Sequence, residues 1–510
     1  MGLGSSHVVV LLTLTVYLAV CFAIGWHFRR RASRDVSSYY VAKREAPGWV
    51  VSLAFFSTFI STNTYIGQAG EAFAAGLSWA WVGVFWTVFC MISWLLLGPR
   101  LRNQTAGLGS VTVPDYFDFR YRSPLSKATR VLSAVTILFA TIWYMAGIAK
   151  GSAHLLEAVL GTPYVWGALA TIIFTCAYTV LGGMYGVLWT DAIQGAIMFF
   201  VALLMAAIPF LYAGGPTELM SRISDVSHVS TAGAPIGDGL VTFCSLVSFT
   251  YILGIGLSVG MKQVAEPRCL VRFYSVDNAR SMRFAMIWTP VFLGISMVSI
   301  MGLGALVHGM ATEQEAAYLV THTDEVVGFM LAKFDNTAVS AICITGLFAA
   351  GMSSLASVML IVGTAVVGDI WNIWMPMQPD QMVRRTKLSI LGYSAIVFVI
   401  TIFPPAGIVE MTSFSGAVFV ASFFPALFGG LYLRWGTGHG AFWSMLLGMA
   451  ATLLWRFGIR FRVAGMGEIH EIIPAFCISV LVYAVVSRMT SSHRPDDTHL
   501  NALFDGSSVR

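Results

Sequence analysis

Thirteen runs of about 20 nearly uncharged residues dominate this 510-residue sequence. A helix of that length crosses a hydrocarbon core of about 30 Å. Only 11% of the residues are charged, against roughly a quarter in an average globular chain. The chain therefore has too few charged residues to cover the surface of a soluble globule. The sequence therefore predicts an all-α polytopic membrane protein, with spans at 8–27, 48–73, 78–99, 128–152, 162–183, 187–212, 241–260, 284–308, 337–365, 388–404, 406–433, 438–457 and 469–487.

The distribution of basic residues predicts the orientation of these spans. An odd number of spans puts the termini on opposite sides, and 24 of the 30 Lys and Arg residues fall on the side of the C-terminus. Because basic loops stay in the cytoplasm, we expect the N-terminus outside and the C-terminus cytoplasmic, in a plasma membrane such as the bacterial inner membrane. The net charge of +5 is then a topology signal, and no nucleic-acid partner is expected.

Cysteine and histidine give no sign of a cofactor. Six of the seven Cys residues lie inside expected helices, and the ten His residues show no metal-ligand spacing. We expect no disulfide framework, no structural metal and no cofactor. No nucleophile, base or metal cluster lies near one interface, which argues against a membrane enzyme.

Two spans are interrupted by glycine in corresponding places of the chain. Span 48–73 contains Gly67 and Gly70, and span 241–260 contains Gly254, Gly256 and Gly260. Paired broken helices in two halves of a chain point to the central site of a secondary transporter. The alternative is that glycine lets membrane helices pack closely.

Hydroxyl side chains gather near one of these breaks and in the ninth span. Ser353, Ser354 and Ser357 share the segment GLFAAGMSSLASVML, and the first interrupted span holds Ser57, Thr58, Ser61, Thr62 and Thr64. Hydroxyls and unwound backbone can supply the oxygen ligands of a hard cation, although they can also bond within their own helices. Asp191, in LGGMYGVLWTDAIQG, predicts either a cation relay towards the cytoplasm or a shallow helix cap.

These segments resemble the sodium:solute symporter family over nearly the whole chain, most specifically in LGGMYGVLWTDAIQG and GLFAAGMSSLASVML. The resemblance implies a LeuT-type fold with 13 transmembrane helices, in which two inverted repeats of five helices occupy 48–212 and 241–433. An extra helix and a basic cytoplasmic loop would lie in 1–47 and two further helices in 438–490. We read the polar tail 491–510 as disordered.

The resemblance also implies the site residues. A first sodium ion would bind the backbone of Ser57, Ile60 and Ala350 with the hydroxyls of Ser353 and Ser354. A possible second ion would use Ser61, Asp191 and Ser357, although Ala356 stands where family members with this site have a second hydroxyl. The expected solute pocket comprises Asn63, Thr64, Gln68, Tyr251, Gln263, Ser413 and Phe414.

The sequence narrows the solute to a class. Sugar-binding members carry acidic and amide side chains where this chain has Asn63, Thr64 and Gly83, and they use a lysine that is absent here, which argues against a sugar. Exposed helix N-termini favour a carboxylate, so with no intramembrane Lys or Arg expected, we predict sodium-coupled import of a monocarboxylate or amino acid. The alternatives are a solute sensor with a separate signalling partner and a proton-coupled carrier. We expect the functional unit to be the monomer. This chain has Glu266-Pro267 where the family commonly has Gln-Pro, and the sequence gives no physical reason for the difference.

Overall fold

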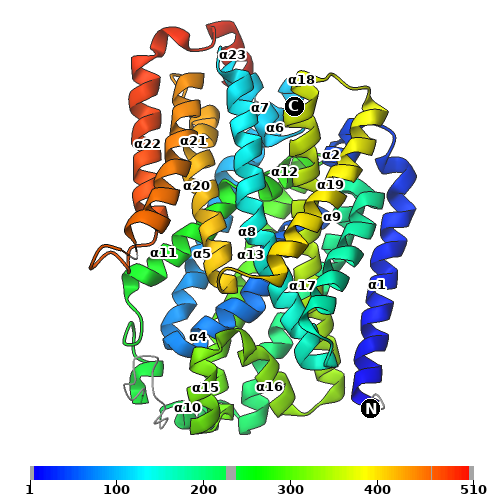
Figure 1. Cartoon of the computed structure of the whole chain (residues 1–510), viewed down its shortest axis with the longest axis vertical. Coiled ribbons are helices and arrows are strands. Elements are labelled where there is room, and N and C mark those ends of the chain that lie inside the picture. Colours follow the sequence, from blue (N-terminus) through cyan, green and yellow to red (C-terminus); the bar gives the residue numbers. More distant parts are fainter. Residues whose placement is uncertain (1–4, 225–236, 461, 505–510) are drawn as a thin grey trace.

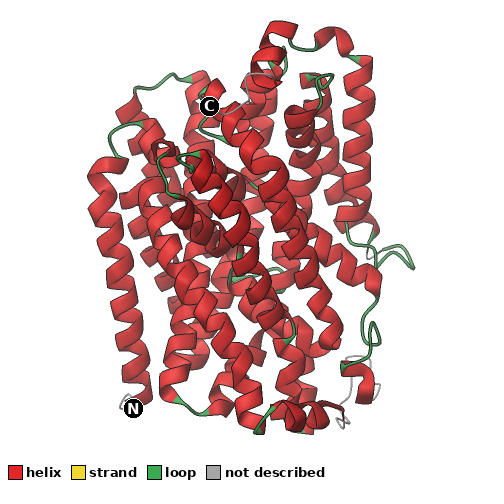
Figure 2. Cartoon of the chain, turned by 180° about the vertical axis from the view of Figure 1, so that it is seen from behind, coloured by secondary structure: helices red, strands yellow, loops and turns green. Residues whose placement is uncertain are grey.

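The computed structural model describes residues 5–224, 237–460 and 462–504. Within these ranges the chain is helical, with one isolated β-bridge between Ala46 and Val276. Long helices lie beside one another along the molecule's longest axis (Figures 1 and 2). This arrangement satisfies backbone hydrogen bonds inside each segment, as a bilayer requires.

Nine helices have 16 or more residues: α1 (Ser5–Ala32), α8 (Ser126–Leu160), α9 (Tyr164–Ala213), α13 (Ala279–Met301), α17 (Thr337–Thr364), α19 (Pro379–Ile402), α20 (Ile408–Tyr432), α21 (Gly438–Leu453) and α22 (Ile472–Met489). The shorter ones are α2 (Val36–Val41), α3 (Gly48–Phe59), α4 (Ala69–Ala75), α5 (Ala80–Ile92), α6 (Gly98–Leu108), α7 (Val113–Tyr121), α10 (Pro216–Ser224), α11 (Phe249–Gly260), α12 (Pro267–Ser275), α14 (Leu303–Val307), α15 (Glu313–Thr321), α16 (Val326–Phe334), α18 (Asn372–Trp374) and α23 (Asp497–Phe504). Four π-helical stretches extend them, η2 (Asn63–Gln68), η4 (Ser93–Leu97), η9 (Ala365–Trp371) and η10 (Leu454–Ile459). The 3₁₀ turns are η1 (Ala42–Arg44), η3 (Gly76–Trp79), η5 (Gly237–Leu240), η6 (Met261–Val264), η7 (His308–Met310), η8 (Thr323–Glu325) and η11 (Ser491–His493).

Ten helical stretches of the described residues are long and apolar enough to cross a membrane, so the chain is a multi-pass membrane protein. They differ from the thirteen expected spans at identifiable places. Helices α3 and α11 have only 12 residues each. The expected spans 162–183 and 187–212 correspond to the two helical parts of α9, which meet at the non-helical residue Gly183, where φ is 50° and ψ is −151°.

The two helix breaks lie at other residues than the glycines that predicted them. Helix α3 ends at Phe59, Ile60 is extended with φ −77° and ψ 132°, and helical structure resumes in η2. The second break follows α11 and η6 at Ala265 and Glu266, before α12 begins at Pro267.

The glycines themselves serve close packing, so the packing alternative holds for them. A Cβ on Gly254 would lie 2.5 Å from Cβ of His470, and one on Gly256 would lie 2.6 Å from the ring of Phe85. A Cβ on Gly70 would lie 2.0 Å from the carbonyl oxygen of Thr323. The prediction of breaks at glycine was therefore wrong in position, although both interrupted segments exist.

Helix α12 lies inside the molecule. All of its residues are buried. The β-bridge ties its end to the start of α3: the Ala46 N–H donates to the Ser275 carbonyl at 2.9 Å, and the Asp277 N–H donates to the Ala46 carbonyl at 3.1 Å. The two interrupted segments are thus linked directly.

The polar tail is also folded where the structure describes it, whereas disorder was expected. Helix α23 buries His499, Leu500 and Leu503, because these apolar-face residues recur at helical spacing; residues 505–510 lie outside the described ranges. In Figure 1, α1 begins at the lower end of the molecule and α23 lies at the upper end.

Candidate ion and solute site

Two serine hydroxyls of α17 meet the first helix break. The Ser353 hydroxyl donates to the carbonyls of Ser57 at 2.9 Å and Ala350 at 3.2 Å. The Ser354 hydroxyl lies 3.4 Å from the carbonyl oxygen of Ile60. The structure therefore brings together all five residues expected at the first sodium site, and all five are completely buried.

The break explains why these carbonyls are available. In a continuous helix the Ser57 carbonyl would accept the N–H of Ser61. Here the Ser61 N–H donates instead to the Thr64 hydroxyl at 3.3 Å. Backbone oxygens released in this way are the ligands that unwound transporter helices offer to sodium.

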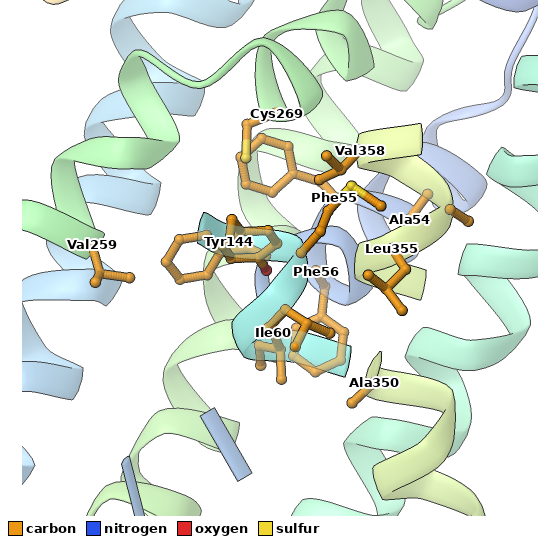
Figure 3. Close-up of a cluster of buried hydrophobic side chains, with 14 of the residues drawn as sticks. Ala54, Phe55, Phe56, Ile60, Tyr144, Val259, Cys269, Ala350, Leu355 and Val358 are labelled. Atoms are coloured by element: carbon orange, nitrogen blue, oxygen red, sulfur yellow. The ribbon is translucent and has the colours of Figure 1, made fainter. Parts of the chain in front are cut away.

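An apolar shell surrounds this group of oxygens. Figure 3 shows Ala54, Phe55, Phe56 and Ile60 from the first interrupted segment, with Ala350 and Leu355 from α17, in one buried cluster. Such a surrounding lowers the local dielectric and strengthens any ion–oxygen attraction.

Asp191 is completely buried inside the protein and is paired. Its Oδ2 accepts the Ser357 hydroxyl at 3.0 Å and the Thr58 hydroxyl at 3.2 Å. The same oxygen lies 2.5 Å from Nη2 of Arg272 in α12. That guanidinium compensates the cost of placing a carboxylate inside the molecule.

This geometry differs from the expected second ion site. Ser357 and Asp191 are together, but within the described residues the Ser61 side chain makes no hydrogen bond to either. Arg272 Nη2 also donates to Ser357 at 2.5 Å and to Thr58 at 2.8 Å. A protein cation therefore contacts two of the three residues expected at a second sodium site, Asp191 and Ser357.

Two of the expected solute residues line a cavity of about 650 Å³. Tyr251 and Ser413 lie in its wall with Glu71, Glu410 and Arg456. The cavity is thus lined by side chains of both charges.

The remaining expected solute residues divide into two groups. Asn63, Thr64 and Gln68 are buried in η2, and Gln68 accepts the Trp79 ring N–H at 3.0 Å. Gln263 and Phe414 face elsewhere: the Gln263 amide donates to the Trp86 carbonyl at 2.8 Å, and Phe414 packs on Trp143 with ring centroids 5.1 Å apart. Neither of these two side chains lines the 650 Å³ cavity, and their part in a solute site stays a prediction.

Three charged residues at the second break were missed. Lys262, Glu266 and Arg268 are all at most 3% exposed, and Arg268 Nε lies 2.7 Å from Glu266 Oε1. The signal was available, since Lys262 and Glu266 stand four residues apart, as do Arg268 and Arg272, in an otherwise apolar stretch. Glu266 now has a physical role, because its carboxylate balances buried cations.

Comparisons with known proteins agree with this geometry. The sequence model of the sodium:solute symporter family matches residues 39–448. The chain is 26% identical over 490 residues to the osmoregulated proline transporter of Bacillus subtilis (strain 168), covering 94% of this chain and 95% of that protein. It is 27% identical over 500 residues to the sodium/proline symporter of Escherichia coli (strain K12), covering 94% of each.

Solved structures share the fold. A Na⁺-coupled sialic acid symporter in a substrate-bound outward-open state superimposes with a TM-score of 0.76 at 16% identity, covering 95% of this chain and 97% of that one. A nucleobase-cation-symport-1 family transporter in a closed conformation gives a TM-score of 0.51 at 12% identity, covering 91% and 97%.

Proposed function

Because the chain belongs to the sodium:solute symporter family, we propose that it imports a small monocarboxylate or amino acid together with sodium by alternating access. The contact of Ser353 and Ser354 with the carbonyls at the Ile60 break carries this proposal. Sodium would replace the hydroxyl hydrogen bonds with direct oxygen coordination.

The proposed architecture is the LeuT type. Two inverted five-helix repeats would occupy 48–212 and 241–433, with the N-terminus outside and the C-terminus in the cytoplasm. Support comes from the matched breaks at Ile60 and at Ala265–Glu266, each following a 12-residue helix, and from the TM-score to the sialic acid symporter.

We further propose that one sodium ion is coupled to each solute. Arg272 supplies the positive charge beside Asp191, so a second ion there would meet a like charge in a buried setting. The single ion at the first break would then favour the solute-competent state through its differential affinity.

The two amino-acid symporters among the relatives support an organic solute of this size, since both are described as proline transporters. A proton-coupled carrier and a sensor remain the competing functions. Each would leave uptake insensitive to an imposed sodium gradient.

Purified protein in proteoliposomes tests the proposal. Uptake of labelled monocarboxylates and amino acids should require inward sodium, with a Hill coefficient for sodium of about one. Sodium alone should also raise the melting temperature, since a ligand that binds only the folded state stabilises it. Uptake driven by a pH gradient in the absence of sodium would overturn sodium coupling.

A further inference from the structure

A group of buried charges surrounds the second helix break. Glu266 Oε1 lies 2.7 Å from Nε of Arg268 and 3.6 Å from Nζ of Lys262. One carboxylate thus faces two cations, and each of the three side chains is at most 2% exposed.

The buried charges of this region do not cancel. The neighbouring charges that interact with the group are Asp191 and Arg272, which form a neutral pair. With Lys262 in its ammonium form, the three cations Lys262, Arg268 and Arg272 face Glu266 and Asp191 among the described residues, which leaves one positive charge in excess. Buried charge without a partner is costly, so this excess points to a missing anion.

Lys262 carries that excess. Its ammonium makes no hydrogen bond within the described part of the chain, although a lysine offers three donors. Besides Glu266 at 3.6 Å, its neighbours are aromatic: Nζ lies 3.7 Å from the ring centroid of Tyr144 and 5.9 Å from that of Phe419. Ring faces attract the cation without accepting a conventional hydrogen bond.

Two helices connect the wall of the 650 Å³ cavity to Lys262. Tyr251 and Ile255 of α11 line the cavity, and Lys262 comes seven residues after Ile255 in the 3₁₀ turn η6 that continues α11. On α20, Ser413 lines the cavity and Gly416 lies three residues later. A Cβ on Gly416 would be 3.6 Å from Cδ of Lys262, so both helices lead from the cavity to the lysine.

We propose that the Lys262 ammonium binds the carboxylate of the transported solute, which is therefore a net-anionic monocarboxylate and not a zwitterionic amino acid. This inference rests on the proposed function and selects between its two solute classes. A monocarboxylate neutralises the excess charge. A zwitterion would add an ammonium beside two buried cations, with Glu266 already paired to Arg268.

Transport by the full chain in proteoliposomes tests this assignment. Under an inward sodium gradient, the wild-type protein should accumulate labelled acetate, propionate or lactate at least about tenfold better than L-proline. Lys262→Met should reduce carboxylate uptake by about tenfold or more, and Lys262→Arg should retain more of it than Lys262→Met. Preferred uptake of proline by the wild type, or unchanged carboxylate uptake by Lys262→Met, would overturn the proposal.

Sodium-induced stabilisation separates failure of this inference from failure of sodium coupling. Measured without solute, it should persist in Lys262→Met, which also shows that the variant is folded. Glu266→Gln raises the excess to two positive charges and should shift preference towards a dicarboxylate such as succinate. Sodium stabilisation without transport of any carboxylate refutes the Lys262 assignment alone, whereas absence of sodium stabilisation in the wild type refutes the sodium site.

Discussion

The guanidinium of Arg272 lies 2.5 Å from the carboxylate of Asp191, and both side chains are enclosed by the protein. The pair joins α12, the second half of one interrupted segment, to α9. Thr58 and Ser357 bond to the same two groups. Four segments that are far apart in the sequence therefore meet at one ion pair.

Removing one member of this pair should destabilise the protein strongly. Asp191→Asn leaves Arg272 buried without an anion, a change that costs about 3–5 kcal/mol. Arg272→Met likewise leaves the Asp191 carboxylate buried without a cation. The double variant Asp191→Asn/Arg272→Met should recover most of the loss. Thermal unfolding of the four proteins in detergent measures this cycle, and losses that simply add would contradict a direct pair.

Ser354→Ala should weaken sodium binding with little effect on folding. It removes one oxygen that contacts the Ile60 carbonyl, and a lost interaction with a charged group costs about 1.5–3 kcal/mol. The sodium concentration for half-maximal uptake should rise by about tenfold or more. Ser422→Ala is the matched control, because this buried hydroxyl of α20 has no hydrogen-bond partner in the described structure; an unchanged sodium dependence in Ser354→Ala would remove the assignment.

The serine pair was predictable because its signal is local. Ser353 and Ser354 stand side by side in one apolar helix, and hydroxyls in that setting need oxygen or ion partners. The break at Ile60 was not predictable, because it depends on the Ser61 N–H donating to the Thr64 hydroxyl. No glycine or proline marks it in the sequence. The contact of Asp191 with Arg272 was not predictable, because it joins residues 81 positions apart and no local sequence pattern gives such a pairing.

Gly183→Ala should destabilise α9. Its φ of 50° with ψ of −151° lies in a region that costs a side chain about 1–3 kcal/mol, and a Cβ would lie 2.7 Å from the ring of Tyr39. Gly392→Ala in α19 is the control, because its Cβ would meet nothing within 4 Å and alanine favours a helix. Melting temperatures should fall for the first variant alone; equal melting temperatures would show that α9 does not need this bend.

Leu500→Asp should release α23 from the body of the protein. Leu500 is 1% exposed, the His499 ring nitrogen lies 3.4 Å from the Arg120 carbonyl, and the Arg120 guanidinium lies over the Phe504 ring at 5.3 Å. Losing the burial of a leucine costs about 1.5–3 kcal/mol. The equilibrium constant for local opening of α23 should therefore increase by about tenfold or more. Chymotrypsin should then cut faster after Phe504, whose ring packs on the Arg120 guanidinium in the docked helix.

The matched control for this release is Thr498→Asp, because Thr498 is exposed on the same helix and receives the same charge without losing a buried contact. Mass spectrometry of the shortened chain identifies cleavage after Phe504. A docked α23 predicts slow cleavage in the wild type and in Thr498→Asp, and rapid cleavage in Leu500→Asp. A disordered tail predicts rapid cleavage in all three, because an unfolded segment gains nothing from burying Leu500. The comparison therefore decides between the folded tail and the disorder that its polar composition had suggested.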